Sequence, residues 1–302
     1  MNHRPPSVIR ESAQRLGPVT AGLYGAILAG CASTSGCGGT PFESRRAEVL
    51  TAPAETAFTL ENTVGDVRVV ADPSATSVRM EVIRIGKGST QQKAAEAVEE
   101  LRFDLIDTPG NEGVVVKTVQ PKSTWAAGKQ HAAEWVITAP PGTRIVVSDD
   151  VGNVTIVGFE NAVSARTDVG DLRLAGISGP VTASSDVGDV HINTAGAVDA
   201  SSDVGNVHIE LFGAAPVPVK AVSNVGNVHV VLPPSWAGTV DARTDVGSLS
   251  ASAPGIATRP DRNGSGGAIA GRLGDNSAAT LTARADVGNL SVDVRQVARA
   301  AD

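Results

Sequence analysis

The segment Val181-Thr182-Ala183-Ser184-Ser185-Asp186-Val187-Gly188-Asp189-Val190 returns with small changes along the second half of this 302-residue sequence. Close copies begin at Val163, Val198, Val219, Val240 and Leu281, and a degenerate copy begins at Ile145. Apolar residues at every second position indicate short strands with one buried face. The Asp-Val-Gly-Asp phrase reads as a turn, because Asp favours the first position and Gly accepts the positive φ at the third position of a type II turn. A repeat of this kind predicts a stack of similar units.

The turn glycines indicate how the units connect. They recur every 17 to 21 residues from Gly152 to Gly247, and the last gap, from Gly247 to Gly288, is about two such steps. A two-residue hairpin needs a type I′ or II′ turn, which Val-Gly fits poorly, so a corner between two faces of a coil suits the phrase better. A three-residue hairpin with a glycine bulge is the alternative. We therefore predict an all-β fold, a parallel β-solenoid with two strands per coil, in which one coil before Gly288 is lost or remodelled.

Parallel coils place equivalent residues in columns about 4.8 Å apart. Valine at the first position of each unit and alanine at the third then face inward, which leaves room for only a thin core. The aromatic content of 3% agrees with this. Since each coil buries little by itself, its stability comes from contact with neighbouring coils.

The first 47 residues have the composition of an export signal and a tether. Residues 1–30 join an arginine-containing leader to an apolar stretch of signal-peptide length, too short to span a bilayer well. The stretch ends in Leu28-Ala29-Gly30-Cys31, which resembles the bacterial lipobox, and the resemblance implies cleavage before Cys31 and diacylglycerol on its thiol. The alternative is a soluble secreted protein in which Cys31 is incidental. Residues 31–47, which include Cys37 in a Gly- and Ser-rich run, form the expected tether.

Residues 48–142 show a different pattern, which predicts a small α+β cap on the first coil. Alanine and valine share one face of a helix expected over Thr90 to Leu101, and glutamates occupy the other face. Residues 109–113 connect two apolar runs and predict a hairpin. The solenoid is expected over residues 143–296, and residues 253–278 within it, which have turn chemistry but no clear period, are expected to be a loop insertion.

These features together resemble the bacterial putative-adhesin family of β-strand-repeat domains, over about residues 48–294. The resemblance rests on the strand–helix–hairpin unit, the Asp-Val-Gly-Asn/Asp repeats and the closing segment Ala283-Arg284-Ala285-Asp286-Val287-Gly288-Asn289-Leu290. It implies a solenoid-like parallel β architecture of unknown function, often found on lipoproteins and membrane-anchored envelope proteins. It implies no catalytic residues.

The turn aspartates form the first candidate site. Stacking would align the carboxylates of Asp168, Asp186 and Asp203, which repel one another unless they are solvated, protonated or bridged by a cation. Calcium binds several oxygen ligands and would suit such a column. The alternative is that these aspartates are only good turn residues bonded to their own backbone.

Three of the five histidines form the second candidate site. His191, His208 and His229 each occupy the first outward position after a turn, so they should share one column. Neighbouring imidazoles could share zinc or copper, or take up protons together below about pH 6.5. The alternative is a solvated polar face whose histidines were copied when the repeat was duplicated.

Composition and motifs limit the function. A formal net charge of −7 without a Lys/Arg cluster argues against nucleic-acid binding. The sequence contains no Ser-His-Asp pattern, zinc-protease motif or phosphate loop, so we expect no enzyme and no cofactor. The predicted function is non-catalytic binding or scaffolding by an extracytoplasmic protein held to a bacterial membrane through lipid on Cys31, with an envelope protein or a polysaccharide as partner. The alternatives are a calcium- or zinc-binding envelope module and, less favoured, a polysaccharide-active β-helix enzyme.

Overall fold

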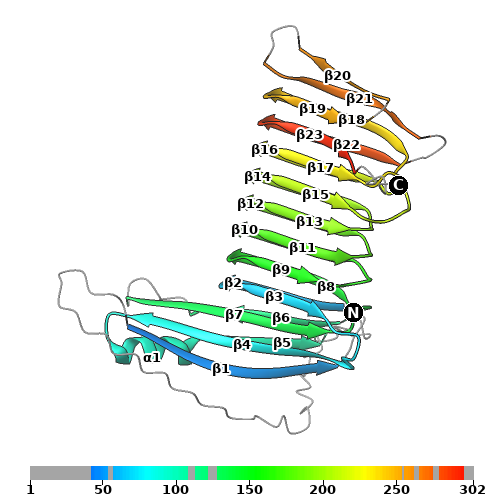
Figure 1. The fold of residues 1–302 in the computed structure, drawn as a ribbon. Coiled ribbons are helices and arrows are strands. Elements are labelled where there is room, and N and C mark those ends of the chain that lie inside the picture. The colour runs from blue at the N-terminus through cyan, green and yellow to red at the C-terminus, as the bar shows by residue number, and fades with distance from the viewer. Residues whose placement is uncertain are drawn as a thin grey trace, which may run out of the picture.

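The computed structural model describes residues 42–53, 57–107, 113–121, 128–253, 255–261, 265–274 and 279–295. In this part of the chain two β-sheets form a tall stack, and longer strands with one helix form a wider layer at its N-terminal end (Figure 1). Strands account for about 68% and helix for about 4%, which confirms the predicted all-β fold class. The strand orders are β1-β4-β7-β3-β9-β11-β13-β15-β17-β23-β19 in one sheet and β20-β21-β18-β22-β16-β14-β12-β10-β8-β2-β6-β5 in the other.

Each repeat of the central stack adds one strand to each sheet. The pairs are β8 (Arg144–Val151) with β9 (Val154–Val157), β10 (Val163–Val169) with β11 (Leu172–Ile177), β12 (Val181–Val187) with β13 (Val190–Thr194), β14 (Val198–Val204) with β15 (Val207–Leu211), and β16 (Val219–Val225) with β17 (Val228–Leu232). Neighbouring coils pair in parallel and in register, so that Val181 pairs with both Val163 and Val198. The parallel coil is therefore confirmed, and the hairpin alternative is wrong for these repeats.

Glycine is required at the repeat corners by space, and from Gly170 onward also by conformation. Gly188 has φ +149°, and a Cβ atom added there would lie 2.0 Å from the carbonyl oxygen of Gly170 in the preceding coil. The corner is more extended than the type II turn that we predicted, whose third residue has φ near +80°. The reason is that the amide of Gly188 donates to Val204 of the next coil, at 2.9 Å, instead of closing a local turn.

The C-terminal part does not follow sequence order. Strands β22 (Thr280–Val287) and β23 (Leu290–Val294) pair directly with β16 and β17. Strands β18 (Gly238–Val246) and β19 (Leu249–Ser252), which come earlier in the chain, form the next coil of the stack. Leu281 accordingly pairs with Val219 on one side and Val240 on the other. No coil is lost between Gly247 and Gly288, because the chain leaves one position empty and returns to fill it. This corrects our reading of the last gap.

The described part of the segment that carries the chain back contains two strands. We expected residues 253–278 to be a loop insertion, but they contain β20 (Ile256–Pro260) and β21 (Gly267–Leu273). These strands pair antiparallel with each other, and β21 pairs antiparallel with β18. The antiparallel strands extend one sheet past the last parallel coil, with β20 at its edge.

The N-terminal layer contains both cap strands and the first coil. Its elements are β1 (Phe42–Pro53), β2 (Ala57–Val64), β3 (Val67–Ala71), β4 (Ser77–Gly88), α1 (Gln91–Glu100), β5 (Arg102–Asp107), β6 (Val114–Val119) and β7 (Lys129–Ala139). Strands β2 and β3 pair in parallel with β8 and β9, so the first coil lies inside the segment that we assigned to the cap. Strand β1 pairs antiparallel with β4, so the expected tether is already a strand from residue 42. The helix and the β5–β6 hairpin are present as predicted.

A single apolar core runs the length of the stack. It is thin between the repeats, where inward valines alternate with alanines such as Ala183 and Ala200, and it widens in the cap around Phe58 and Trp135. Most of the repeats also bury a hydroxyl beside the corner. Ser185 Oγ donates to the carbonyl of Gly170 at 3.0 Å, and Ser202 Oγ donates to that of Gly188 at 2.8 Å. These bonds connect each coil to the preceding one.

Candidate functional site

The aspartate column predicted from the sequence lies along the outside of the corners. Asp168 and Asp186 have half-exposed side chains, and the guanidinium of Arg166 lies between them, 3.0 Å from one carboxylate and 3.1 Å from the other. The Asp203 carboxylate accepts a 3.0 Å hydrogen bond from the side-chain amide of Asn224. A protein cation, the Arg166 guanidinium, thus bridges Asp168 and Asp186, where a metal ion was the predicted alternative. Within the described ranges, no three His, Cys, Asp or Glu side chains are grouped so as to hold a metal ion.

A second column of Asp and Asn, just after the corner glycines, has a structural role. The side-chain oxygen of each residue accepts the backbone N–H of its equivalent in the next coil. Asp171 accepts from Asp189 at 2.8 Å, and Asp189 accepts from Asn206 at 2.7 Å. The preference for Asp and Asn that we ascribed to turn chemistry is therefore a preference for an acceptor that reaches one coil along the stack.

Between these two columns lies a row of valines that sequence reasoning missed. We call this row the valine ridge; its seven members, in stacking order, are Val151, Val169, Val187, Val204, Val225, Val287 and Val246. Their exposed fractions lie between 46% and 51%. The available signal was the return of Val at every Asp-Val-Gly corner. Strict alternation would place this valine inward, in phase with Ala183 and Ser185, but Val187 is exposed because the alternation ends at the corner.

The three histidines do share one column, on the outer face of the other sheet. His208 pairs in register with His191 and His229, and the ring centroids are 5.8 Å and 4.7 Å apart. Burial, followed by the neighbouring imidazoles of His229 and His191, lowers the pKa of His208. His229 Nε2 lies 3.0 Å from the Asp293 carboxylate, so one end of the column already has a protein partner.

Asp149 is a buried carboxyl group that the sequence did not reveal. It stands 1% exposed where the later coils have their buried hydroxyl, and its Oδ1 accepts a 2.9 Å hydrogen bond from the amide of Asn62. Its Oδ2 has no partner. Burial first, and then the carboxylates of Asp150 and Asp66, raise the pKa of Asp149 to about 7. Asp149, at the junction between the first two coils, therefore holds its proton at a pH where an ordinary aspartate is fully ionised.

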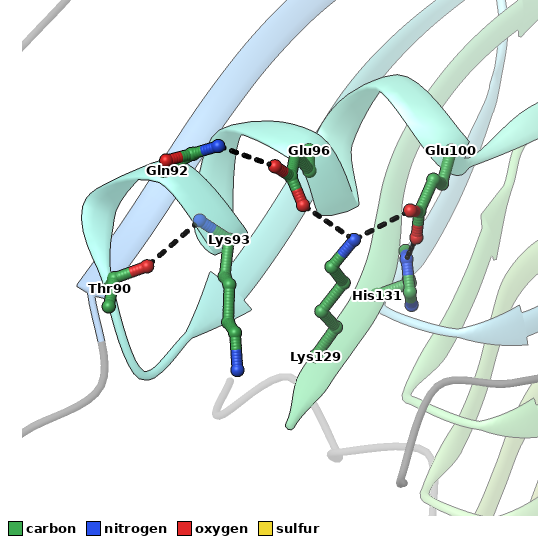
Figure 2. A network of polar contacts seen from close by, with 7 residues as sticks. All are labelled: Thr90, Gln92, Lys93, Glu96, Glu100, Lys129 and His131. Carbon is green, nitrogen blue, oxygen red and sulfur yellow. Dashed lines mark hydrogen bonds and ion pairs between the residues drawn. The ribbon is translucent and has the colours of Figure 1, made fainter. Parts of the chain in front are cut away.

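The cap holds the densest cluster of charged side chains (Figure 2). Lys129, at the start of β7, lies between Glu96 and Glu100 on successive turns of α1, at 2.8 Å and 2.7 Å. Behind it, the fully buried His131 has Nε2 3.3 Å from Glu100, and burial lowers its pKa. The hydrogen bond to Lys129 lowers the pKa values of both glutamates. The charges are satisfied by one another, so the cluster fixes the helix against β7.

Cys31, the predicted lipidation site, lies outside the described residues. In the part of the chain that the structure describes, no helix is long and apolar enough to cross a bilayer.

Comparison with known proteins gave only distant similarity. No protein-family profile matches the sequence, and no curated protein matches it. A solved putative cell adhesion protein from Clostridium sporogenes is 13% identical, with a TM-score of 0.32 over 85% of this chain and 100% of the other. Putative adhesins from Bacteroides fragilis and Parabacteroides merdae are 14% and 9% identical, with TM-scores of 0.42 and 0.27, over 83% of this chain in both cases and 97% and 96% of theirs. Because all three TM-scores are below 0.5, these similarities support no functional argument.

Proposed function

We propose that this chain is a lipid-anchored, extracytoplasmic protein of the bacterial cell envelope, and that it acts by non-catalytic binding and scaffolding through the corners of its solenoid. The observation that carries the proposal is the valine ridge. Scattered exposed valines are ordinary, but a contiguous apolar row on a soluble surface marks an interaction site.

The size and rigidity of the ridge support this role. Seven rungs at the inter-strand spacing span about 29 Å. The backbone beneath is fixed by the corner hydrogen bonds, such as the 2.9 Å bond from Gly188 to Val204, and by the buried hydroxyls. A partner that covers the ridge therefore pays little to order it, which favours tight binding from a modest area.

The remaining polar clusters support a binding protein over an enzyme. The two carboxylates, the ammonium and the imidazole around Lys129 are engaged in fixing α1, and the acidic column is bridged by Arg166. These charged groups are paired with one another, and the buried Nδ1 of His131 is the one ring nitrogen of the Lys129 cluster without a hydrogen-bond partner. Binding through shape and apolar contact requires none of them.

Anchoring through Cys31 can be tested by metabolic labelling with an alkyne fatty acid. We expect label on the natural chain and on Cys37→Ser, and none on Cys31→Ser, which should also leave the membrane fraction. Label that persists on Cys31→Ser would contradict the anchor.

Binding through the ridge can be tested with the lipidated chain cross-linked in intact cells. The double variant Val187→Ser with Val204→Ser should lose the cross-linked partners, because it removes the apolar centre of the ridge. A matched control, Ser184→Ala with Ser201→Ala, changes two outward side chains of the same strands and should keep them. The proposal fails if both variants give the partners of the natural chain, provided their melting temperatures are equal.

A further inference from the structure

The surface beside the valine ridge is rich in carboxylates. Of the 32 Asp and Glu residues of the chain, nine aspartates border the seven valines and the first corner; they are Asp66, Asp150, Asp168, Asp171, Asp186, Asp189, Asp203, Asp245 and Asp286. Two arginines, Arg166 and Arg284, are paired with members of this group, whereas Arg243, in register with Arg284, is paired with Asp241. The borders of the ridge therefore carry more carboxylates than cationic groups.

Repulsion between neighbouring carboxylates is present at the first corners. Burial first, and then the carboxylate of Asp168, raise the pKa of Asp150. The arginines relieve only part of the repulsion, since Arg166 serves Asp168 and Asp186 while Asp203 has a neutral partner, Asn224. A cationic partner would further reduce the repulsion between the carboxylates, which the two arginines relieve only in part.

The apolar centre of this surface limits the class of partner further. Valine side chains offer no flat aromatic face for sugar rings, and the tryptophans that the structure describes, Trp135 and Trp236, are buried. A second copy of the chain would bring two acidic borders together. A protein segment with both aliphatic and basic side chains satisfies both the ridge and its borders.

We infer that the valine ridge binds an extended, positively charged protein segment, whose aliphatic side chains cover the valines while its Lys or Arg side chains reach the aspartates on either side. This inference rests on the proposed function and specifies its partner. At about 3.3 Å per residue, roughly nine residues of extended chain would cover the ridge from end to end. Charge complementarity of this kind sets specificity and speeds association, and it weakens with salt.

The test uses the folded full chain and three synthetic twelve-residue peptides, measured by fluorescence anisotropy at low and at high salt. One peptide alternates Lys with Val, the second Glu with Val, and the third Lys with Ser. We expect the Lys/Val peptide to bind, the Glu/Val peptide not to bind, and the Lys/Ser peptide to bind at least about tenfold more weakly, because it cannot cover the valines. Equal binding of Lys/Val and Glu/Val, or of Lys/Val and Lys/Ser, would overturn the inference.

Variants of the chain separate the two contributions. Val187→Ser with Val204→Ser should weaken the Lys/Val peptide at both salt concentrations, whereas Asp186→Asn with Asp203→Asn should weaken it mainly at low salt. Ser184→Ala with Ser201→Ala is the control and should leave binding unchanged. If polygalacturonate or calcium ions bind at the ridge and the Lys/Val peptide does not, the protein partner is wrong. If cross-linking in cells depends on the ridge but no peptide binds, the inference fails while the proposed function stands.

Discussion

At the scale of single residues, Asp149 links the folded state to pH. Its Oδ2 is buried without a partner, at the position where Thr167 and Ser185 donate a hydroxyl hydrogen to the glycine carbonyl of the preceding coil. A proton on this carboxyl group makes it a donor like those hydroxyls. Ionisation instead leaves a charge in the core, stabilised by hydrogen bonds from the side-chain amide of Asn62 and the backbone of Asp150.

The sign of the pH effect follows from the pKa. The folded-state pKa of Asp149 is raised to about 7 from an ordinary 3.8, so the folded chain holds a proton that the unfolded chain has released. The contribution of this group to the free energy of unfolding is therefore full below about pH 4, falls as the pH rises to about 7, and is then constant. We expect Asp149→Asn to remove this fall and to be more stable than the natural chain at pH 8 by up to roughly 4 kcal/mol, at 1.4 kcal/mol per pKa unit.

Urea unfolding between pH 4 and pH 8 measures this difference. The control is Asp104→Asn, because it makes the same chemical change at an exposed position. Identical slopes for the natural chain and Asp149→Asn would show that Asp149 is ionised in the fold.

Corner glycines give a second prediction at this scale. Gly188→Ala must place a Cβ atom 2.0 Å from the Gly170 carbonyl oxygen at φ +149°, so it should lower the stability by about 3 kcal/mol or more. Gly142→Ala, with no atom within 4 Å of the added Cβ, should change it little. Thermal unfolding of both variants makes the comparison, and equal melting temperatures would mean that the stack yields easily at its corners.

At the scale of the element, a coil is stabilised by the hydrogen bond that its buried hydroxyl donates to the preceding coil. The buried hydroxyl is present in successive coils as Thr167, Ser185, Ser202, Ser223 and Thr244. The coil formed by β22 and β23 has Ala285 at this position, where Ala285 pairs in register with Ser223. That coil therefore lacks the hydrogen bond to the preceding glycine carbonyl, here that of Gly226, which the neighbouring coils have.

This gap predicts opposite effects for two small substitutions. Ser202→Ala removes a 2.8 Å hydrogen bond to Gly188 and should cost about 1 kcal/mol, whereas Ala285→Ser restores the missing bond and should gain about 0.5–1 kcal/mol. Urea denaturation curves with unchanged slopes would measure both. A loss of stability in Ala285→Ser would show that the hydroxyl cannot reach the carbonyl there.

At the scale of the whole molecule, the repeat was sufficient to predict the coil but not the order of the coils. Alternation and the Val-Gly corner are local, so they predicted the strands, the parallel register and the histidine column. The exchange of the last two coils is not local, because Val240 and Leu281 begin equivalent repeats and either could follow β17. The exposure of the valine ridge and the burial of Asp149 were not predicted for another reason. Exposure and burial at a corner depend on neighbouring coils, which alternation along one strand does not describe.

The exchanged order predicts where the stack opens first. In a one-dimensional stack the end coils open most easily, and the last strands of a chain are usually the end. Here β23 lies between β17 and β19, while β19 and β20 are the edge strands of the two sheets (Figure 1). Amide hydrogens of residues 290–294 should therefore exchange more slowly than those of residues 249–252, and residues 280–287 more slowly than residues 256–260. Hydrogen exchange followed by mass spectrometry measures all four segments, with β12 as a protected reference. Faster exchange in 290–294 than in 249–252 would mean that the coils stack in chain order, with β23 at the free end.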